Sequence, residues 1–246
     1  MHEIFLNAEP LFFVGTFPFT NTLLVSSFAV VLIALGSYLL SRKYAEIPGT
    51  AQGVIEIVYE EFASLIDSVL GNKKKSEQYL PFVATLFIFI LVSNWLGILP
   101  GFGSIGIKEE HHFIPLLRSP ASDLNFTLAI AVLTVVMVNV FGVMAIGVWK
   151  HASKFLNFSS PINFFVGILE FISEIARMIS FAFRLFGNVF AGEVLLVVIA
   201  FLVPFLAPVP FFFLEIFVGF IQAFVFSMLA LVFIAIATVP HGSGHE

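Results

Sequence analysis

The sequence contains no cysteine and few charged residues. The absence of cysteine excludes a disulfide framework, a thiolate metal site and a cysteine nucleophile. Asp, Glu, Lys and Arg make up 11% of the 246 residues, against about 25% in an average soluble domain. So few charges cannot cover a water-soluble protein in which 59% of the residues are hydrophobic. The composition therefore excludes a soluble enzyme and a nucleic-acid-binding protein, and it predicts an integral membrane protein that lies in a lipid bilayer.

Long segments with few or no charges predict an all-α protein with five transmembrane helices. About 20 apolar residues are enough for a helix to cross the hydrocarbon core of a bilayer, and the apolar runs are too long, and too little alternating, for strands. We expect a single polytopic membrane domain over residues 1–246, with a proline-rich turn between the last two helices. The predicted spans are residues 18–41, 80–100, 124–148, 178–203 and 209–238.

Residues 50–70 predict an amphipathic helix outside the spans. Ile55, Val58 and Phe62 recur at helical spacing, with carboxylates between them. Such a helix lies at the membrane interface or against a partner. A second amphipathic stretch, at about residues 160–177, leads into the fourth span.

Basic residues in the loops predict the orientation in the membrane. Seven Lys and Arg residues follow the first and third spans, two follow the second span, and none precedes the first. Because cytoplasmic loops carry an excess of Lys and Arg, we expect the N-terminus outside and the C-terminus in the cytoplasm.

The fourth span contains a stripe of polar and charged residues. Ionisable side chains at the centre of a bilayer cost at least about 2.5–3.5 kcal/mol each, so they mark functional sites by default. Glu170, Arg177 and Arg184 follow one another at intervals of seven residues, which places them on one helix face. Ser180 and Asn188 each lie four residues from Arg184 and line the same face.

Antiparallel packing of the last two spans brings further polar residues together. Glu215 and Gln222 are seven residues apart and share a face of the fifth span. In one register of the hairpin, Arg184 faces Gln222, and Glu193 faces Glu215 nearer the turn. We therefore expect two polar levels, with the carboxylate level toward the outside.

These residue types predict the movement of protons. Arginine stays protonated at any working pH, so Arg184 cannot relay protons, but it can attract a passing carboxylate and repel cations. Two neighbouring carboxylates do not both ionise easily, which makes Glu193 and Glu215 candidate proton carriers. A fixed cation between an uptake path and a release path would let protons cross only on a mobile partner.

Other interpretations of the same residues remain open. Arg184 could pair with Glu193 or Glu174 and only hold the helices together. Arg184 could instead bind the anionic substrate of a secondary transporter, but the sequence shows no inverted repeat, and an odd number of spans argues against two matching halves. Glu174 can form an i, i+3 ion pair with Arg177, and near the interface both charges either line a solvated path or extend toward the headgroups.

The segment from Ser180 to Glu193, SFAFRLFGNVFAGE, resembles the signature of subunit a of the F-type ATP synthase membrane sector, of the bacterial type. Residues 82–101, 122–128 and 220–226 resemble the second, third and last spans of that family. Some members carry His where this chain has Glu215, so the outer relay here would be a double carboxylate.

The resemblance implies a stator subunit beside a rotating ring of c subunits, with two offset half-channels that couple proton flow to ATP synthesis. It implies that the last two helices are long and tilted, and that Arg184 keeps the half-channels apart. The implied proton-translocation residues are Arg184, Asn188, Glu193, Glu215 and Gln222. The implied half-channel lining residues are Glu170, Ser180, Glu174, Arg177 and Asp123.

The same resemblance implies the setting of the protein. The subunit would not be catalytic by itself, and we expect no cofactor and no metal ion. Its partners would be the c ring, b-type peripheral stalk subunits and other ATP synthase subunits, with no nucleic acid. Its location would be a bacterial plasma membrane.

Overall fold

Long helices dominate the computed structural model, which describes residues 10–42, 49–99, 105–109, 112–155, 160–204 and 206–239. Five of the helices in these ranges are long and apolar enough to cross a membrane. They are α1 (Asn21–Arg42), α3 (Lys73–Ile98), α4 (Leu124–Ile146), α6 (Pro161–Leu202) and α7 (Pro208–Ala237). The prediction of an all-α integral membrane protein with five spans is confirmed.

Shorter elements connect the long helices. Two antiparallel β hairpins, which the sequence analysis did not predict, precede α1 and η2. Besides α2, the shorter elements are β1 (Pro10–Val14), β2 (Phe17–Thr20), β3 (Gly106–Glu109), β4 (His112–Pro115), the 3-10 helix η2 (Pro120–Ser122) and α5 (Val148–Ala152).

The predicted amphipathic helix is α2 (Thr50–Leu70). Gly71 ends this helix in the left-handed region, with φ of 62°, which favours glycine. Asn72 then starts α3, because its side chain accepts hydrogen bonds from the backbone amides of Lys74 and Lys75. Phe62 and Ile66 on the buried face of α2 pack against the core that α3 and α7 share.

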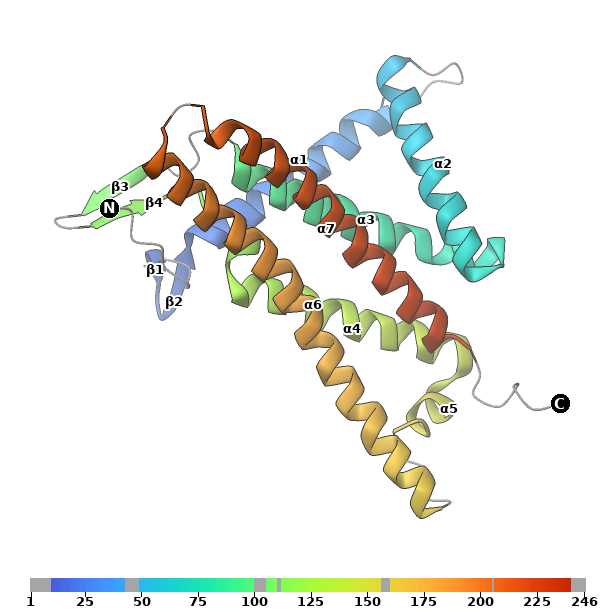
Figure 1. The fold of residues 1–246 in the computed structure, drawn as a ribbon. Helices are drawn as coiled ribbons and strands as arrows, with labels where there is room; N and C mark the ends of the chain where they lie inside the picture. The colour runs from blue at the N-terminus through green and yellow to red at the C-terminus, as the bar shows by residue number, and fades with distance from the viewer. Residues whose placement is uncertain are drawn as a thin grey trace.

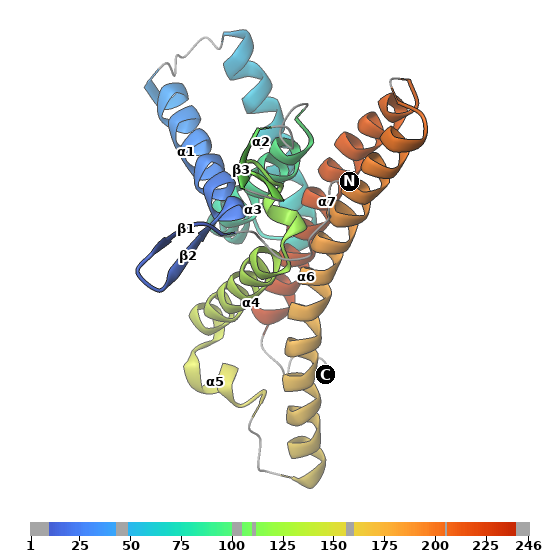
Figure 2. The ribbon, with the colours of Figure 1, turned by 90° about the vertical axis from the view of Figure 1, so that its left-hand side faces the viewer.

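The start of α6 differs from the predicted start of the fourth span. We predicted a span over 178–203, with an amphipathic stretch at about 160–177 leading into it, and the structure has one helix without a break from Pro161 to Leu202. Ser160 caps its first turn, and the helix contains no further proline that could interrupt it. A helix of 42 residues is about 63 Å long, so it exceeds the hydrocarbon thickness unless it is steeply tilted. Figures 1 and 2 show its first turns extending beyond the other helices.

The buried core lies where α7 meets α3, α4 and α6. Phe181 of α6 and Phe226 of α7 are fully buried, with ring centroids 4.5 Å apart. Most of the outward-facing residues on the long helices are large and apolar. This pattern suits helices whose outer faces contact lipid instead of water.

The functional residues lie toward two opposite ends of the bundle. We call the end with the α6–α7 turn, the β hairpins and η2 the turn end. The opposite end, with α5, the start of α6 and the end of α7, is the α5 end. Figure 1 shows the two groups of elements at opposite ends of α7.

Candidate functional site

A hydrogen bond between side chains fixes the register of α6 and α7. The Asn188 amide donates to the Gln222 amide oxygen over 2.7 Å. Asn188 lies 14 residues before Leu202, which ends α6, and Gln222 lies 14 residues after Pro208, which starts α7. The predicted partner of Gln222 was Arg184, one helical turn away. That prediction was wrong because it centred the hairpin slightly too early in the sequence.

Arg184 lies in a cavity between α6 and α7. The guanidinium of Arg184 donates to the Ser180 hydroxyl over 3.3 Å. Among the described residues, no carboxylate forms an ion pair with Arg184. The space, about 300 Å³ in volume, is called the Arg184 cavity below. Its lining residues are Ser173, Ala176, Arg177, Ser180, Phe181, Arg184, Leu229 and Phe233.

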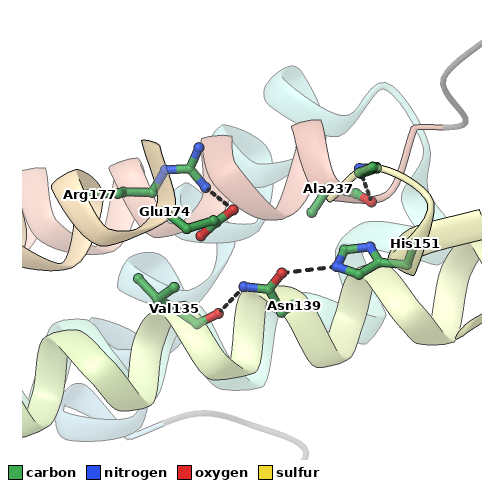
Figure 3. Close-up of polar contacts among 7 residues, drawn as sticks. Val135, Asn139, His151, Glu174, Arg177 and Ala237 are labelled. Atoms are coloured by element: carbon green, nitrogen blue, oxygen red, sulfur yellow. Dashed lines mark hydrogen bonds and ion pairs between the residues drawn. The ribbon is translucent and has the colours of Figure 1, made fainter. Parts of the chain in front are cut away.

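Arg177 lines the same cavity but has a counter-ion. Its guanidinium forms an ion pair with the Glu174 carboxylate at 2.8 Å and lies over the Phe233 ring, 4.0 Å from the ring centroid. Figure 3 shows the two charged side chains turned toward each other between α6 and α4. The i, i+3 ion pair expected from the sequence is therefore present in the structure.

Lys154 and His151 lie at the α5 end, where α7 ends. The Lys154 ammonium donates to the Ala237 carbonyl over 3.5 Å, at the last residue of α7. The His151 ring is buried and bonds to the Asn139 side chain of α4 over 2.9 Å (Figure 3). Burial lowers the pKa of Lys154, whereas the carboxylates of Glu170 and Glu174 act in the opposite direction. Glu170 thus lies within electrostatic range of this basic residue at the α5 end.

Two carboxylates approach each other on the turn-end side of Asn188. Glu215 is buried, and its carboxylate lies directly against Gly192. A Cβ atom at Gly192 would overlap the Glu215 carboxylate, so any larger residue there would require this carboxylate to move. The half-buried Glu193 interacts electrostatically with Glu215, as well as with the Arg118 guanidinium and the Ser122 hydroxyl. The structure therefore brings Glu193 and Glu215 together on the opposite side of Arg184 from the Arg177–Glu174 pair.

The family model described as ATP synthase A chain matches residues 23–235. The chain belongs to the ATP synthase A chain family. ATP synthase subunit a of Moorella thermoacetica is 34% identical over 227 residues, which cover 92% of this chain and 94% of that protein. ATP synthase subunit a 1 of Syntrophotalea carbinolica is 36% identical over 211 residues, covering 84% of this chain and 81% of that protein. ATP synthase subunit a of Campylobacter jejuni strain RM1221 is 33% identical over 248 residues, covering 100% of both chains.

In this member of the ATP synthase A chain family, sequence reasoning missed two residues near the carboxylate pair. The Arg118 guanidinium donates to the Ser122 hydroxyl over 3.1 Å and to the Ser122 carbonyl over 3.4 Å. Ser122 is fully buried in η2, which packs against α6. Arg118 is one of two basic residues between the second and third spans. The sequence gives no sign, however, that this loop folds back onto α6.

The structure places Asp123 at the contact between α1 and α4. One carboxylate oxygen of Asp123 accepts a hydrogen bond from the backbone amide of Asn125, which caps α4. The other oxygen accepts from the Thr22 hydroxyl of α1 over 3.1 Å. One oxygen of this buried side chain therefore caps α4 and the other joins α4 to α1, and lining a half-channel stays a prediction for Asp123.

Proposed function

We propose that this chain is subunit a of a bacterial F-type ATP synthase, the stator subunit that provides two proton half-channels to a rotating ring. One observation carries the proposal. Arg184, without a carboxylate partner among the described residues, lies between the polar lining of its cavity on the α5-end side and the carboxylates of Glu193 and Glu215 on the turn-end side. The family to which the chain belongs supports the same function.

The Arg184 cavity would form the half-channel toward the α5 end. Ser180 and Arg177 supply polar atoms along its wall, and Arg184 stands at its inner limit. A cavity of about 300 Å³ has room for several water molecules. Glu170, near Lys154, would lie at its opening to the aqueous phase.

The carboxylates of Glu193 and Glu215 would form the half-channel toward the turn end. Their neighbours Arg118 and Ser122 supply the polar surroundings that a proton carrier needs. The Asn188–Gln222 pair lies between these carboxylates and Arg184. These two amide side chains would keep the path polar. Because amides do not carry protons, they would leave a gap in the row of titratable groups beside the arginine.

Protons would cross only by means of the ring. During synthesis, a proton taken up at Glu193 and Glu215 passes to a carboxylate of the ring, and rotation carries the neutral carboxylic acid that results through lipid. When that group reaches the Arg184 cavity, the guanidinium attracts its carboxylate form, and the proton leaves toward the α5 end. Arg184 itself stays charged and repels cations, so it blocks direct flow. The subunit makes no bond of ATP and is not catalytic by itself.

An exposed stripe of small residues on α6 supports the ring as the partner. Small residues let neighbouring membrane helices approach closely, and a Cβ atom at Gly187 would meet nothing within 4 Å. The exposed small residues of the stripe are Ser173, Ala176, Ser180, Gly187 and Ala191. Peripheral stalk subunits of the b type complete the proposed set of partners.

The proposed orientation follows from the loop charges. The turn end and the N-terminus face the outside of a bacterial plasma membrane, and the α5 end and the C-terminus face the cytoplasm. The transporter alternative, in which Arg184 binds an anionic substrate, receives no support from the comparisons.

Cross-linking in the assembled complex tests the proposal. Because the chain has no cysteine, Ala176→Cys and Ala191→Cys each introduce a single thiol. We expect each to form disulfide cross-links with cysteines placed on the outer helix of the ring, whereas Gly36→Cys on α1 does not. Cross-linking at Gly36→Cys alone, or purification of the chain without ring subunits, would contradict the proposal.

A further inference from the structure

Two arginines line the Arg184 cavity, but only one of them is neutralised. Arg177 and Arg184 are seven residues apart on α6, so they are separated by about 10 Å along the helix axis. Arg177 has the Glu174 carboxylate as its partner, whereas Arg184 has no carboxylate partner among the described residues.

The ion pair holds Arg177 in a fixed place. The side chains of Arg177 and Glu174 keep only 17% and 14% of their surface exposed, so their attraction is less screened than at an open surface. The Phe233 ring, 4.0 Å from the Arg177 guanidinium, restricts it on another side. A guanidinium held on two sides cannot swing away from the cavity wall.

An unpaired Arg177 would oppose the passage of protons. A fixed positive charge beside a narrow polar path raises the energy of any cation in it, and this effect acts over distances of about 10 Å in a protein interior. The proposed mechanism requires one such charge, at Arg184, between the two half-channels. A second uncompensated charge on the release path would slow every proton that leaves.

We propose that Glu174 neutralises Arg177 and so leaves Arg184 as the one uncompensated arginine of the cavity. Glu174 is a positioning residue in this proposal, because it acts through Arg177 and carries no proton itself. Lys154 and Glu170 lie within electrostatic range of the same pair and bring one charge of each sign. The proposal rests on the proposed function, since it assumes that protons use the Arg184 cavity.

The proposal predicts different effects for the loss of Glu174 and for the loss of Arg177. Glu174→Gln leaves a permanent cation, because arginine does not lose its proton in proteins. Arg177→Gln leaves a carboxyl group, which can bind a proton and become neutral. A purely structural ion pair would lose the same contact in both variants.

ATP-driven acidification of inverted vesicles that contain the complete ATP synthase tests the proposal. We expect Glu174→Gln to slow pumping on the order of tenfold, Arg177→Gln to slow it about threefold at most, and the double variant to pump faster than Glu174→Gln alone. Glu60→Gln, which removes an exposed carboxylate of α2, should pump as the unchanged protein does. Copurification of the ring controls for assembly.

Three outcomes would overturn the proposal. These are equal losses in the two single variants, a double variant as slow as Glu174→Gln, and pumping by Glu174→Gln at the normal rate. If Glu174→Gln fails to assemble, Glu174→Asp, which keeps the charge on a shorter side chain, and the double variant, which removes both charges, should each pump near the normal rate, and slow pumping by both would overturn the proposal. Arg184→Ala in the same vesicles tests the proposed function separately, because loss of pumping there with normal pumping by Glu174→Gln would reject this inference alone.

Discussion

The Asn188 amide donates a hydrogen bond to the Gln222 amide oxygen and joins α6 to α7 between Arg184 and the two carboxylates. The bond of 2.7 Å spans two helices whose other contacts are mostly apolar. Gln222 is buried, with 4% of its surface exposed, whereas Asn188 is exposed, so the bond lies at the edge of the buried core. The Asn188–Gln222 bond therefore lies between the arginine and the carboxylates and keeps them apart along the two helices.

Replacement of Gln222 by an apolar residue of similar size should still disturb the contact between α6 and α7, because the hydrogen bond to Asn188 is lost. Gln222→Leu removes the hydrogen bond to Asn188, and a hydrogen bond of this kind contributes about 0.5–1.5 kcal/mol. We expect lower thermal stability of the purified complex and a severalfold loss of proton-driven ATP synthesis. The exchanged variant Asn188→Gln with Gln222→Asn keeps both amides and should recover part of the activity. Equal activity of Gln222→Leu and the unchanged protein would contradict a role for the bond.

The contact between Gly192 and Glu215 predicts a severe effect of one methyl group. Gly192→Ala places a Cβ atom where the Glu215 carboxylate lies, and such overpacking typically costs about 1–3 kcal/mol. We expect proton-driven ATP synthesis to fall about tenfold or more as the carboxylate is displaced. Glu215→Asp shortens the side chain and should partly restore Gly192→Ala.

Gly36→Ala on α1 is the matched control for this substitution. A Cβ atom at Gly36 meets nothing within 4 Å, so alanine should be tolerated and should favour the helix slightly. If both glycine variants behave alike, the close approach of Glu215 to α6 has no functional importance.

Arg118 should influence the outer carboxylates through its charge. Because its guanidinium is held by Ser122 and interacts with Glu193, Arg118→Gln removes a positive charge that acts on Glu193. We expect a severalfold lower rate of proton-driven ATP synthesis, with the ring still bound. Arg118→Lys should retain more activity than Arg118→Gln. The double variant Arg118→Gln with Glu193→Gln should be little slower than either single variant, because each substitution alone already removes the interaction between the two side chains. If the losses of the two single variants add up in the double variant, Arg118 and Glu193 are not coupled.

The fold was largely predictable from the sequence because the bilayer imposes long apolar helices. The uncharged runs located the spans, and the spacing of Ile55, Val58 and Phe62 located α2. The early start of α6 was not predictable in the same way, because polar residues such as Glu170 and Arg177 look like the end of a membrane span. Tertiary contacts allow one helix to continue through them.

The sequence predicted which site residues share a face of one helix, but not all of the contacts between residues on different helices. Seven-residue spacing put Arg177 and Arg184 on one face, and both line the same cavity. The register across the hairpin was predicted within one residue at Glu215, which contacts Gly192, but Gln222 bonds to Asn188, one turn from the predicted Arg184. Arg118 was missed because its approach to Glu193 depends on the path of a loop, which no periodicity reveals.

The most direct test of the account is ATP-driven acidification of inverted vesicles with Arg184→Ala, with passive proton leak measured alongside. The account predicts that pumping is lost while the complex remains assembled, whether or not leak through the boundary between stator and ring increases. Pumping near the rate of the unchanged protein would contradict the account, because Arg184 could not then be the charge that separates the two half-channels.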